Sequence, residues 1–138
     1  MHKLIPHHTH IVQFHQAWIE DTHLYMKIEL CDNSLEGYWE EQITLNQDDL
    51  MAVLKDALLA LVHLNSHNIA HLDIKEGNIM RTKEGLYKLG DFSVTADLTK
   101  DKKDREFGEG IYAAPEVLQH IITFKADIFS LGITLALV

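Results

Sequence analysis

The stretch that decides the fold spans residues 71–93 and reads HLDIKEGNIMRTKEGLYKLGDFS. Two short β-prone runs, NIM at 78–80 and LYKL at 86–89, flank a turn-forming TKEG, which predicts a β-hairpin. Strands paired in a hairpin lie about 5 Å apart. Asp91, which leaves the second strand, is therefore expected to return close to Asn78, which enters the first.

Polar side chains gather around this hairpin. Asp73 and Lys75 stand just upstream of it, in a polar loop that follows a long apolar stretch. Together with Asn78 and Asp91 they supply two carboxylates, an amide and an ammonium to one small volume. Such a set is suited to holding Mg²⁺, a phosphate and the proton of an attacking hydroxyl. The alternative is a polar loop and hairpin without chemistry.

The spacing of these residues carries a family resemblance. The segment 73–78 matches the D-x-x-x-x-N of a catalytic loop, DFS at 91–93 stands where D-F-G is found, and 114–116 reads APE. Each triplet alone is weak evidence, but their order and separation are specific. The chain resembles a eukaryotic protein kinase.

The resemblance implies a partial kinase-like α+β fold over residues 1–138. It assigns residues 1–31 to the last strands of the small lobe and the hinge. It assigns residues 32–138 to the first half of the mainly helical large lobe. A glycine-rich loop, a strand-3 lysine and a helix-C glutamate are not recognisable in the sequence. We therefore expect a fragment or a truncated gene product.

The remaining elements follow from periodicity and capping. Strands are expected near 12–20 and 23–30, because apolar and polar residues alternate in the second of these segments. Asn46, with an aspartate three residues later, predicts the start of a helix that ends near 67–68. The segment 97–109 reads as a mobile loop in the activation-segment position. Residues 127–138 are almost wholly apolar, which predicts a helix buried on all sides.

By resemblance, the end of the second strand is a hinge that binds ATP. Ile28 is the expected gatekeeper, and Glu29 and Cys31, with the leucine between them, offer backbone groups to adenine. The alternative is an ordinary strand end. The hinge reading is favoured because the catalytic-loop pattern follows at a matching distance.

The resemblance also implies roles for the polar loop. Asp73 accepts the proton of the substrate hydroxyl, and Lys75 neutralises charge on the transferred phosphoryl group. Asn78 and Asp91 hold Mg²⁺, which prefers hard oxygen ligands. Asp127 is expected to accept hydrogen bonds from catalytic-loop N–H groups, since a carboxylate in an apolar segment needs partners.

Two residues depart from the family pattern, and the resemblance implies roles for three others. Leu72 replaces the arginine of H-R-D, so we hypothesise that phosphorylation of the loop does not switch activity on. Ser93 replaces the D-F-G glycine and stiffens that position. Glu109 is expected to pair with Lys75. His71 and the phenylalanine of DFS are expected to be structural, packing the catalytic loop against the metal-binding turn.

Finer motifs resemble the Wee/Myt group of cell-cycle kinases. They include HLDIK, LGD, EVLQ and the region from AW at 17–18 to ELC at 29–31. The resemblance implies phosphorylation of a cyclin-dependent kinase, mainly on tyrosine. A pseudokinase or non-catalytic fragment that acts as a binding surface is the alternative from another class. A third, weaker alternative is an unrelated ATP-binding fold.

Composition limits the kinds of partner and the cellular compartment that we expect. The net charge of −9 and the lack of a basic block argue against nucleic-acid binding. A single cysteine excludes an internal disulfide and suits a reducing compartment, and no apolar run reaches the roughly 18 residues of a membrane span. We expect a chain of the nucleus or cytoplasm. A metal cluster of His7, His8 and His10 is less expected than solvated or half-buried histidines, because no zinc-like spacing surrounds them.

Overall fold

The fold is mixed α+β. A computed structural model describes residues 5–100, 108 and 110–138, which contain three α-helices and three small sheets. The helices are α1 (Leu35–Glu40), α2 (Gln47–Ser66) and α3 (Phe124–Leu137). The strands are β1 (Phe14–Glu20), β2 (His23–Ile28), β3 (Asn33–Ser34), β4 (Ile69–Ala70), β5 (Ile79–Arg81), β6 (Tyr87–Leu89) and β7 (Ala96–Asp97).

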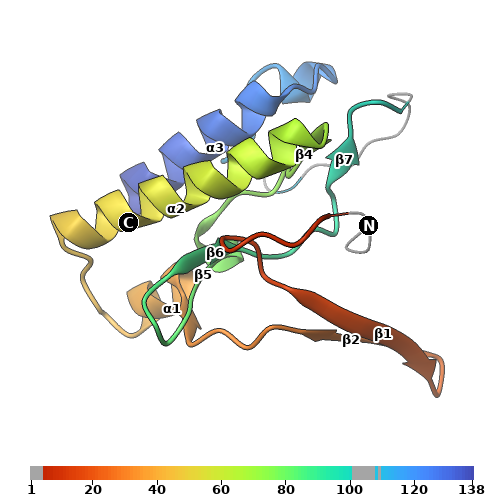
Figure 1. Cartoon of the computed structure of the whole chain (residues 1–138). Helices are drawn as coiled ribbons and strands as arrows, with labels where there is room; N and C mark the ends of the chain where they lie inside the picture. Colours follow the sequence, from red (N-terminus) through yellow and green to blue (C-terminus); the bar gives the residue numbers. More distant parts are fainter. Residues whose placement is uncertain (1–4, 101–107, 109) are drawn as a thin grey trace.

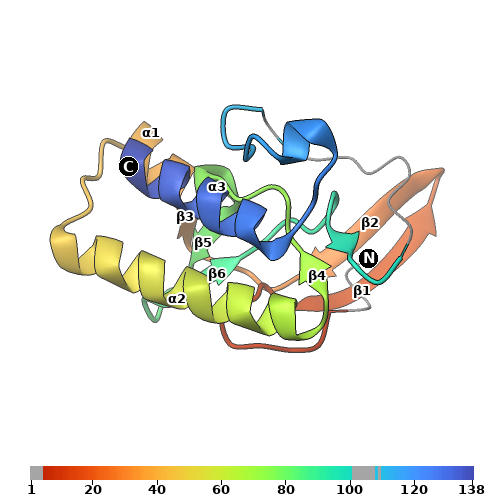
Figure 2. The same ribbon diagram turned by 90° about the horizontal axis from the view of Figure 1, so that it is seen from above.

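The two long helices and the strands form distinct regions. In both views α2 and α3 run side by side, with the β5–β6 hairpin next to α2 (Figures 1 and 2). β3 extends that hairpin into a three-stranded antiparallel sheet, and β4 pairs with β7. The β1–β2 hairpin forms a separate ribbon that projects away from the helices (Figure 1). The segment 71–78, which is predicted to be the catalytic loop, lies between β4 and β5.

Helix α2 forms the scaffold for that segment. Its N-terminus has the predicted capping box, in which the side chains of Asn46 and Asp49 each accept the other's backbone N–H. Its apolar face packs into the main core, which it shares with β5 and β6. The buried Asp56 carboxylate accepts the backbone N–H of Tyr87 at 3.0 Å, so it also fastens the helix to β6.

The predicted hairpin at 78–89 is confirmed with a shift at its start. β5 begins at Ile79, because Asn78 ends a single turn of 3₁₀ helix (Glu76–Asn78). Gly85 closes the turn with a φ of +89°, a conformation that glycine adopts without strain. The N–H of Gly90 donates to the carbonyl of Asn78 at 2.9 Å, which places the two ends of the hairpin together as expected.

Helix α3 differs from its prediction. It is capped by Thr123 and begins at Phe124, and Asp127, Ser130 and Thr134 lie on its buried face. Ile128 and the neighbouring Phe129 remain 50% and 40% exposed, so the expectation of burial on all sides is wrong for this structure. Only one side of α3 packs against the described elements α2 and β4. Within the described ranges, no helix is both long and apolar enough to cross a membrane.

Candidate active site

Helix α3 holds the loop that follows β4 in place. The two carboxylate oxygens of Asp127 accept the backbone N–H groups of His71 and Leu72, both at 2.8 Å. This confirms the expected role of Asp127. Burial raises the pKa of its carboxyl, while the nearby His71 and the two N–H donors oppose the shift. Leu72 adopts a φ of +67°, so the loop turns sharply at the point where it is held.

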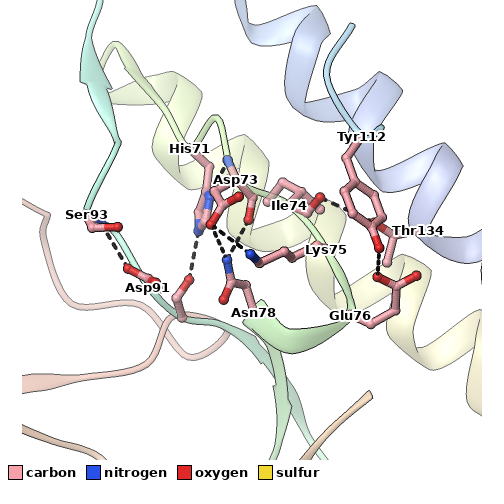
Figure 3. A network of polar contacts seen from close by, with 11 residues as sticks. His71, Asp73, Ile74, Lys75, Glu76, Asn78, Asp91, Ser93, Tyr112 and Thr134 are labelled. Atoms are coloured by element: carbon pink, nitrogen blue, oxygen red, sulfur yellow. Dashed lines mark hydrogen bonds and ion pairs between the residues drawn. The ribbon is translucent and has the colours of Figure 1, made fainter. Parts of the chain in front are cut away.

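His71 joins this loop to the segment that follows β6. One ring nitrogen, Nε2, lies 2.9 Å from the carbonyl of Gly90, and Nδ1 lies 3.3 Å from the N–H of Asp73 (Figure 3). The neutral tautomer with a proton on Nε2 satisfies both contacts. Complete burial lowers the pKa of His71, which favours the same neutral form. Its ring also packs 4.9 Å from that of Phe92, as the structural role predicted for both residues requires.

Three of the predicted site residues meet at the centre of the loop. The Nδ2 group of Asn78 donates to the backbone carbonyl of Asp73 and to its Oδ2, both at 2.8 Å. The Lys75 ammonium lies 3.7 Å from the same Oδ2 (Figure 3). Because both Asn78 amide hydrogens are engaged with Asp73, its Oδ1 is oriented as an acceptor for another group.

Asp91 approaches this group from the end of the β5–β6 hairpin. Its φ is +51°, and its Oδ1 accepts the N–H of Ser93 at 3.1 Å (Figure 3). Serine thus closes a tight local turn in the position where the resemblance expects glycine. The carboxylate of Asp91 and the amide of Asn78 lie at the two joined ends of the hairpin, so the fold brings both predicted metal ligands to one edge.

A cavity of about 490 Å³ opens beside Asp91. It contains all three residues predicted to bind the nucleotide, Ile28, Glu29 and Cys31. The cavity is therefore continuous from the end of β2 to the acidic group after β6. Its walls are mainly apolar and come from the two sides of the connection between β2 and β3: Val12, Met26, Lys27, Leu30, Asn33, Ser34, Met80 and Gly90.

Glu29 has a second, structural set of contacts at this cavity. Its backbone N–H donates to the carbonyl of Gln13 at 2.8 Å, and its Oε2 accepts the Gln13 N–H at 3.0 Å. Its Oε1 forms an ion pair with the Lys88 ammonium. Burial alone raises the pKa of Glu29, but Lys88 and the Gln13 N–H hold it below its ordinary value. The strand end is thereby tied to β6.

Comparisons with known proteins agree with this geometry. A model of the protein kinase domain matches residues 1–138. The chain belongs to the protein kinase family. It is 43% identical over 136 residues to the membrane-associated tyrosine- and threonine-specific cdc2-inhibitory kinase wee-1.3 of Caenorhabditis briggsae, covering 97% of this chain and 21% of that protein.

Other relatives are of the same kind. The mitosis inhibitor protein kinase wee1 of Schizosaccharomyces pombe is 40% identical over 132 residues, covering 92% of this chain and 15% of the relative. The membrane-associated tyrosine- and threonine-specific cdc2-inhibitory kinase of Drosophila melanogaster is 35% identical over 130 residues, with 93% and 24% covered. The chain thus spans a quarter or less of the length of these relatives.

The departure at Leu72 has a packing explanation in this kinase chain. Leu72 is buried in a second apolar cluster with Ala96 and Ala114. These alanines come from β7 and from the APE segment, so an apolar contact joins the loop to both. The leucine side chain is enclosed. An arginine without a partner could not be enclosed in the same place, because burying an unpaired charge is costly.

Sequence reasoning overlooked several contacts around the site. Tyr112 donates from its hydroxyl to Glu76 at 2.6 Å, and its carbonyl accepts from the Ser130 hydroxyl at 2.7 Å. Thr134, one turn further along α3, lies 3.4 Å from the carbonyl of Ile74. The available signal was the spacing of polar residues at 127, 130 and 134 in an apolar helix, which places them on one face.

Gly108 was overlooked as a packing position. Its N–H donates to the carbonyl of Leu72 at 3.0 Å, and a Cβ at this position would overlap the Asp73 carboxylate. Glu109, which was expected to pair with Lys75, and residues 101–107 of the expected mobile loop lie outside the described residues.

Two histidines of the N-terminal segment pack against the rest of the chain. His8 stacks on His63 of α2 with ring centroids 4.5 Å apart, and His10 is buried. Among the residues that the structure describes, no group of three or more histidine, cysteine or acidic side chains is arranged to hold a metal ion.

Proposed function

We propose that this chain is the central part of a Wee/Myt-type protein kinase that transfers the γ-phosphoryl group of ATP to a protein hydroxyl. The observation that carries the proposal is the Asp73–Asn78–Lys75 group, which stands beside a cavity of about 490 Å³ that reaches Asp91. Residues 1–31 would form the end of the small lobe and the hinge. Residues 32–138 would form the first half of the large lobe.

In this proposal each residue of the loop has a separate role in the transfer reaction. Asp73 receives the proton of the substrate hydroxyl, because Asn78 holds its carboxylate and the His71 ring accepts its backbone N–H. Lys75 places a positive charge 3.7 Å from that carboxylate, where the transferred phosphoryl group gathers negative charge. The hydrogen bond from Tyr112 to Glu76 ties the end of this loop to the segment around Tyr112.

The nucleotide and its metal fit the donor set. Ile28, Glu29 and Cys31 border the cavity, and its apolar wall would suit the flat ring of adenine. Asn78 and Asp91 would hold Mg²⁺, whose habit of keeping waters and phosphate oxygens suits one amide and one carboxylate. When bound, Mg²⁺ neutralises charge on the phosphates.

The proposed substrate is a cyclin-dependent kinase, in line with the cdc2-inhibitory relatives, and the proposed setting is intracellular, in the nucleus or cytoplasm. The test uses the natural protein that contains this chain, with radiolabelled ATP and a cyclin-dependent kinase as acceptor. Label is expected on tyrosine or threonine, and Asp73→Asn should abolish transfer while ATP binding persists. Transfer that survives this substitution would contradict the assignment.

The same assay distinguishes an active kinase from the alternative, a pseudokinase. A protein that binds ATP or partner proteins but transfers no label to any acceptor would be a pseudokinase that works as a binding module. The substitutions at Leu72 and Ser93 are the departures that make this alternative worth testing. Equal activity before and after phosphatase treatment is expected, because Leu72 is packed among apolar side chains and offers no cation to a phosphate.

A further inference from the structure

A row of histidine rings joins the N-terminal segment, residues 5–13, to α2. The ring of His8 stacks on that of His63 with centroids 4.5 Å apart and an interplanar angle of 22°. The ring of His67, one turn further along α2, lies 4.6 Å from that of His63. Figure 2 shows the segment beside the C-terminal half of the helix. Three imidazoles therefore meet at this contact, away from the residues proposed to carry catalysis.

Hydrogen bonds define which ring nitrogens carry a proton. Nδ1 of His8 accepts the backbone N–H of His10 at 3.2 Å, so this nitrogen is unprotonated. Nε2 of His63 lies 3.1 Å from the carbonyl of Pro6, which can only accept, so this nitrogen carries a proton. His8 can make its contact only as a neutral ring. Its protonation would end the hydrogen bond to the N–H of His10.

The groups that face His8 would not stabilise a positive charge. Three histidines act on it electrostatically: His63 of α2 and, from its own segment, His7 and His10. Burial, followed by these three neighbours, lowers the pKa of His8. Among the described residues, the carboxylate in contact with this group of histidines is that of Asp56, and it lies 3.5 Å from Nδ1 of His10. Acid would thus place a charge on a stacked ring that has no described ion-pair partner.

Strand β6 packs against the same segment and does not change this balance. Its one charged side chain, Lys88, forms an ion pair with Glu29. The carbonyl of Tyr87 lies 3.0 Å from Nδ1 of His10, so a protonated His10 would keep its hydrogen bond. The ring that must stay neutral is therefore His8, which is stacked on α2.

The N-terminal segment also forms part of the wall of the proposed nucleotide cavity. The N–H of Val12 donates to the carbonyl of Leu89 at 2.8 Å, and the N–H of Leu89 donates to the carbonyl of His10 at 2.9 Å. Val12 lines the cavity. Its neighbour Gln13 accepts the N–H of Glu29, a second lining residue, at 2.8 Å. Release of the segment from α2 would therefore loosen this wall.

We propose that the stacked histidines form a pH-sensitive latch, which holds the N-terminal segment on α2 in neutral solution and releases it in mildly acidic solution. Its effect on nucleotide binding rests on the function proposed above. In the released segment His8 binds a proton with its ordinary pKa of 6.5, whereas the docked ring binds it more weakly. Docking is therefore complete above pH 6.5 and is lost below it. One such histidine changes the ratio of docked to released segment by up to about tenfold between pH 7.5 and 5.5.

The test is backbone hydrogen exchange in the natural protein that contains this chain. Exchange is expressed as protection factors, so that the pH dependence of intrinsic exchange cancels. The amide of Val12, which is bonded to β6, should lose protection about fivefold or more between pH 7.5 and 5.5. His23→Gln in the exposed turn of the β1–β2 hairpin is the control and should behave as the parent.

The matched variant is His8→Asn/His63→Gln. The asparagine oxygen replaces the Nδ1 acceptor, the glutamine N–H replaces the Nε2 donor, and neither side chain titrates. Its Val12 amide should lose protection no more than about twofold over the same range. The proposal is overturned if Val12 keeps its protection in the parent at pH 5.5, or if the double variant loses as much protection as the parent.

Binding of a fluorescent ATP analogue tests the effect on the cavity. From pH 7.5 to 5.5 the affinity of the parent should fall about threefold or more beyond that of the double variant. Comparison with the variant cancels the protonation of the analogue's own phosphates. An equal fall in both proteins would show that the latch does not act on the cavity. If the analogue binds at neither pH while Val12 responds as expected, the proposed nucleotide site fails and the latch stands.

Discussion

The β1–β2 hairpin and the proposed catalytic loop, residues 71–78, differ most in regularity and in burial. The hairpin pairs residue by residue, from Trp18 opposite Tyr25 to Glu20 opposite His23, yet its side chains are exposed. The catalytic loop has almost no repeating structure, yet His71 and Leu72 are buried and their N–H groups are satisfied by a side chain 55 residues or more away.

The difference shows where each region gets its stability. The hairpin depends on its own backbone pairing and cross-strand contacts such as the stacked rings of Trp18 and Tyr25. The loop depends on the Asp127 side chain of α3 and on its own His71 ring, which contacts the carbonyl of Gly90 after β6, in place of the missing repeating hydrogen bonds. Single substitutions should therefore have large effects in or beneath the loop and small effects in the hairpin.

The largest expected effect is at Asp127. Replacing it with alanine leaves the buried N–H groups of His71 and Leu72 without an acceptor, so the protein should lose about 3 kcal/mol of unfolding free energy. Urea unfolding of the natural protein measures the loss. Asp127→Asn keeps one acceptor oxygen and should cost clearly less. Equal costs for the two variants would show that the hydrogen bonds are not what Asp127 contributes.

The next effect is on activity at Gly108. A Cβ at this position overlaps the Asp73 carboxylate, so Gly108→Ala should displace the proposed proton acceptor and lower kcat about 100-fold. Gly132 in α3 is the matched control, because a Cβ there meets no atom within 4 Å. Gly132→Ala should leave kcat unchanged and add up to about 1 kcal/mol of stability. Similar kcat values for both variants would contradict the idea that Gly108 leaves room for the Asp73 carboxylate.

A smaller effect concerns pH. Burial holds the pKa of His71 below its ordinary value of 6.5, so the unfolded chain binds a proton more readily than the folded one. Its influence is absent above pH 6.5 and destabilises the fold as pH falls below that value, by at most about 1.4 kcal/mol per pH unit.

Unfolding free energies measured between pH 7.5 and 5.5 test this expectation. His71→Gln should flatten the slope, whereas His23→Gln in the exposed hairpin should leave it as in the parent. An unchanged slope in the His71 variant would mean that other groups account for the acid sensitivity.

The smallest effect is expected in the hairpin itself. Ile19 is 77% exposed, so Ile19→Thr, which keeps a β-branched side chain, should change stability by no more than about 0.5 kcal/mol. Thermal unfolding of the natural protein provides the measurement. A loss of 2 kcal/mol or more would indicate that another surface covers this ribbon in the natural protein.

The sequence by itself determined the local elements and the protein family. Alternation placed the second exposed strand within a few residues, the Asn46 capping box fixed the start of α2, and the spacing from Asp73 to Asn78 pointed to the kinase family. These signals are readable because they arise from neighbours in the chain, through side-chain direction and local hydrogen bonds.

Tertiary structure decided the contacts that join distant segments. Nothing local predicts that Leu72 packs against Ala114, that Gly108 leaves room for the Asp73 carboxylate, or that one face of α3 stays exposed. Each depends on which surfaces come together once the helices and hairpins pack, because burial and steric overlap are properties of the assembled core rather than of a sequence window.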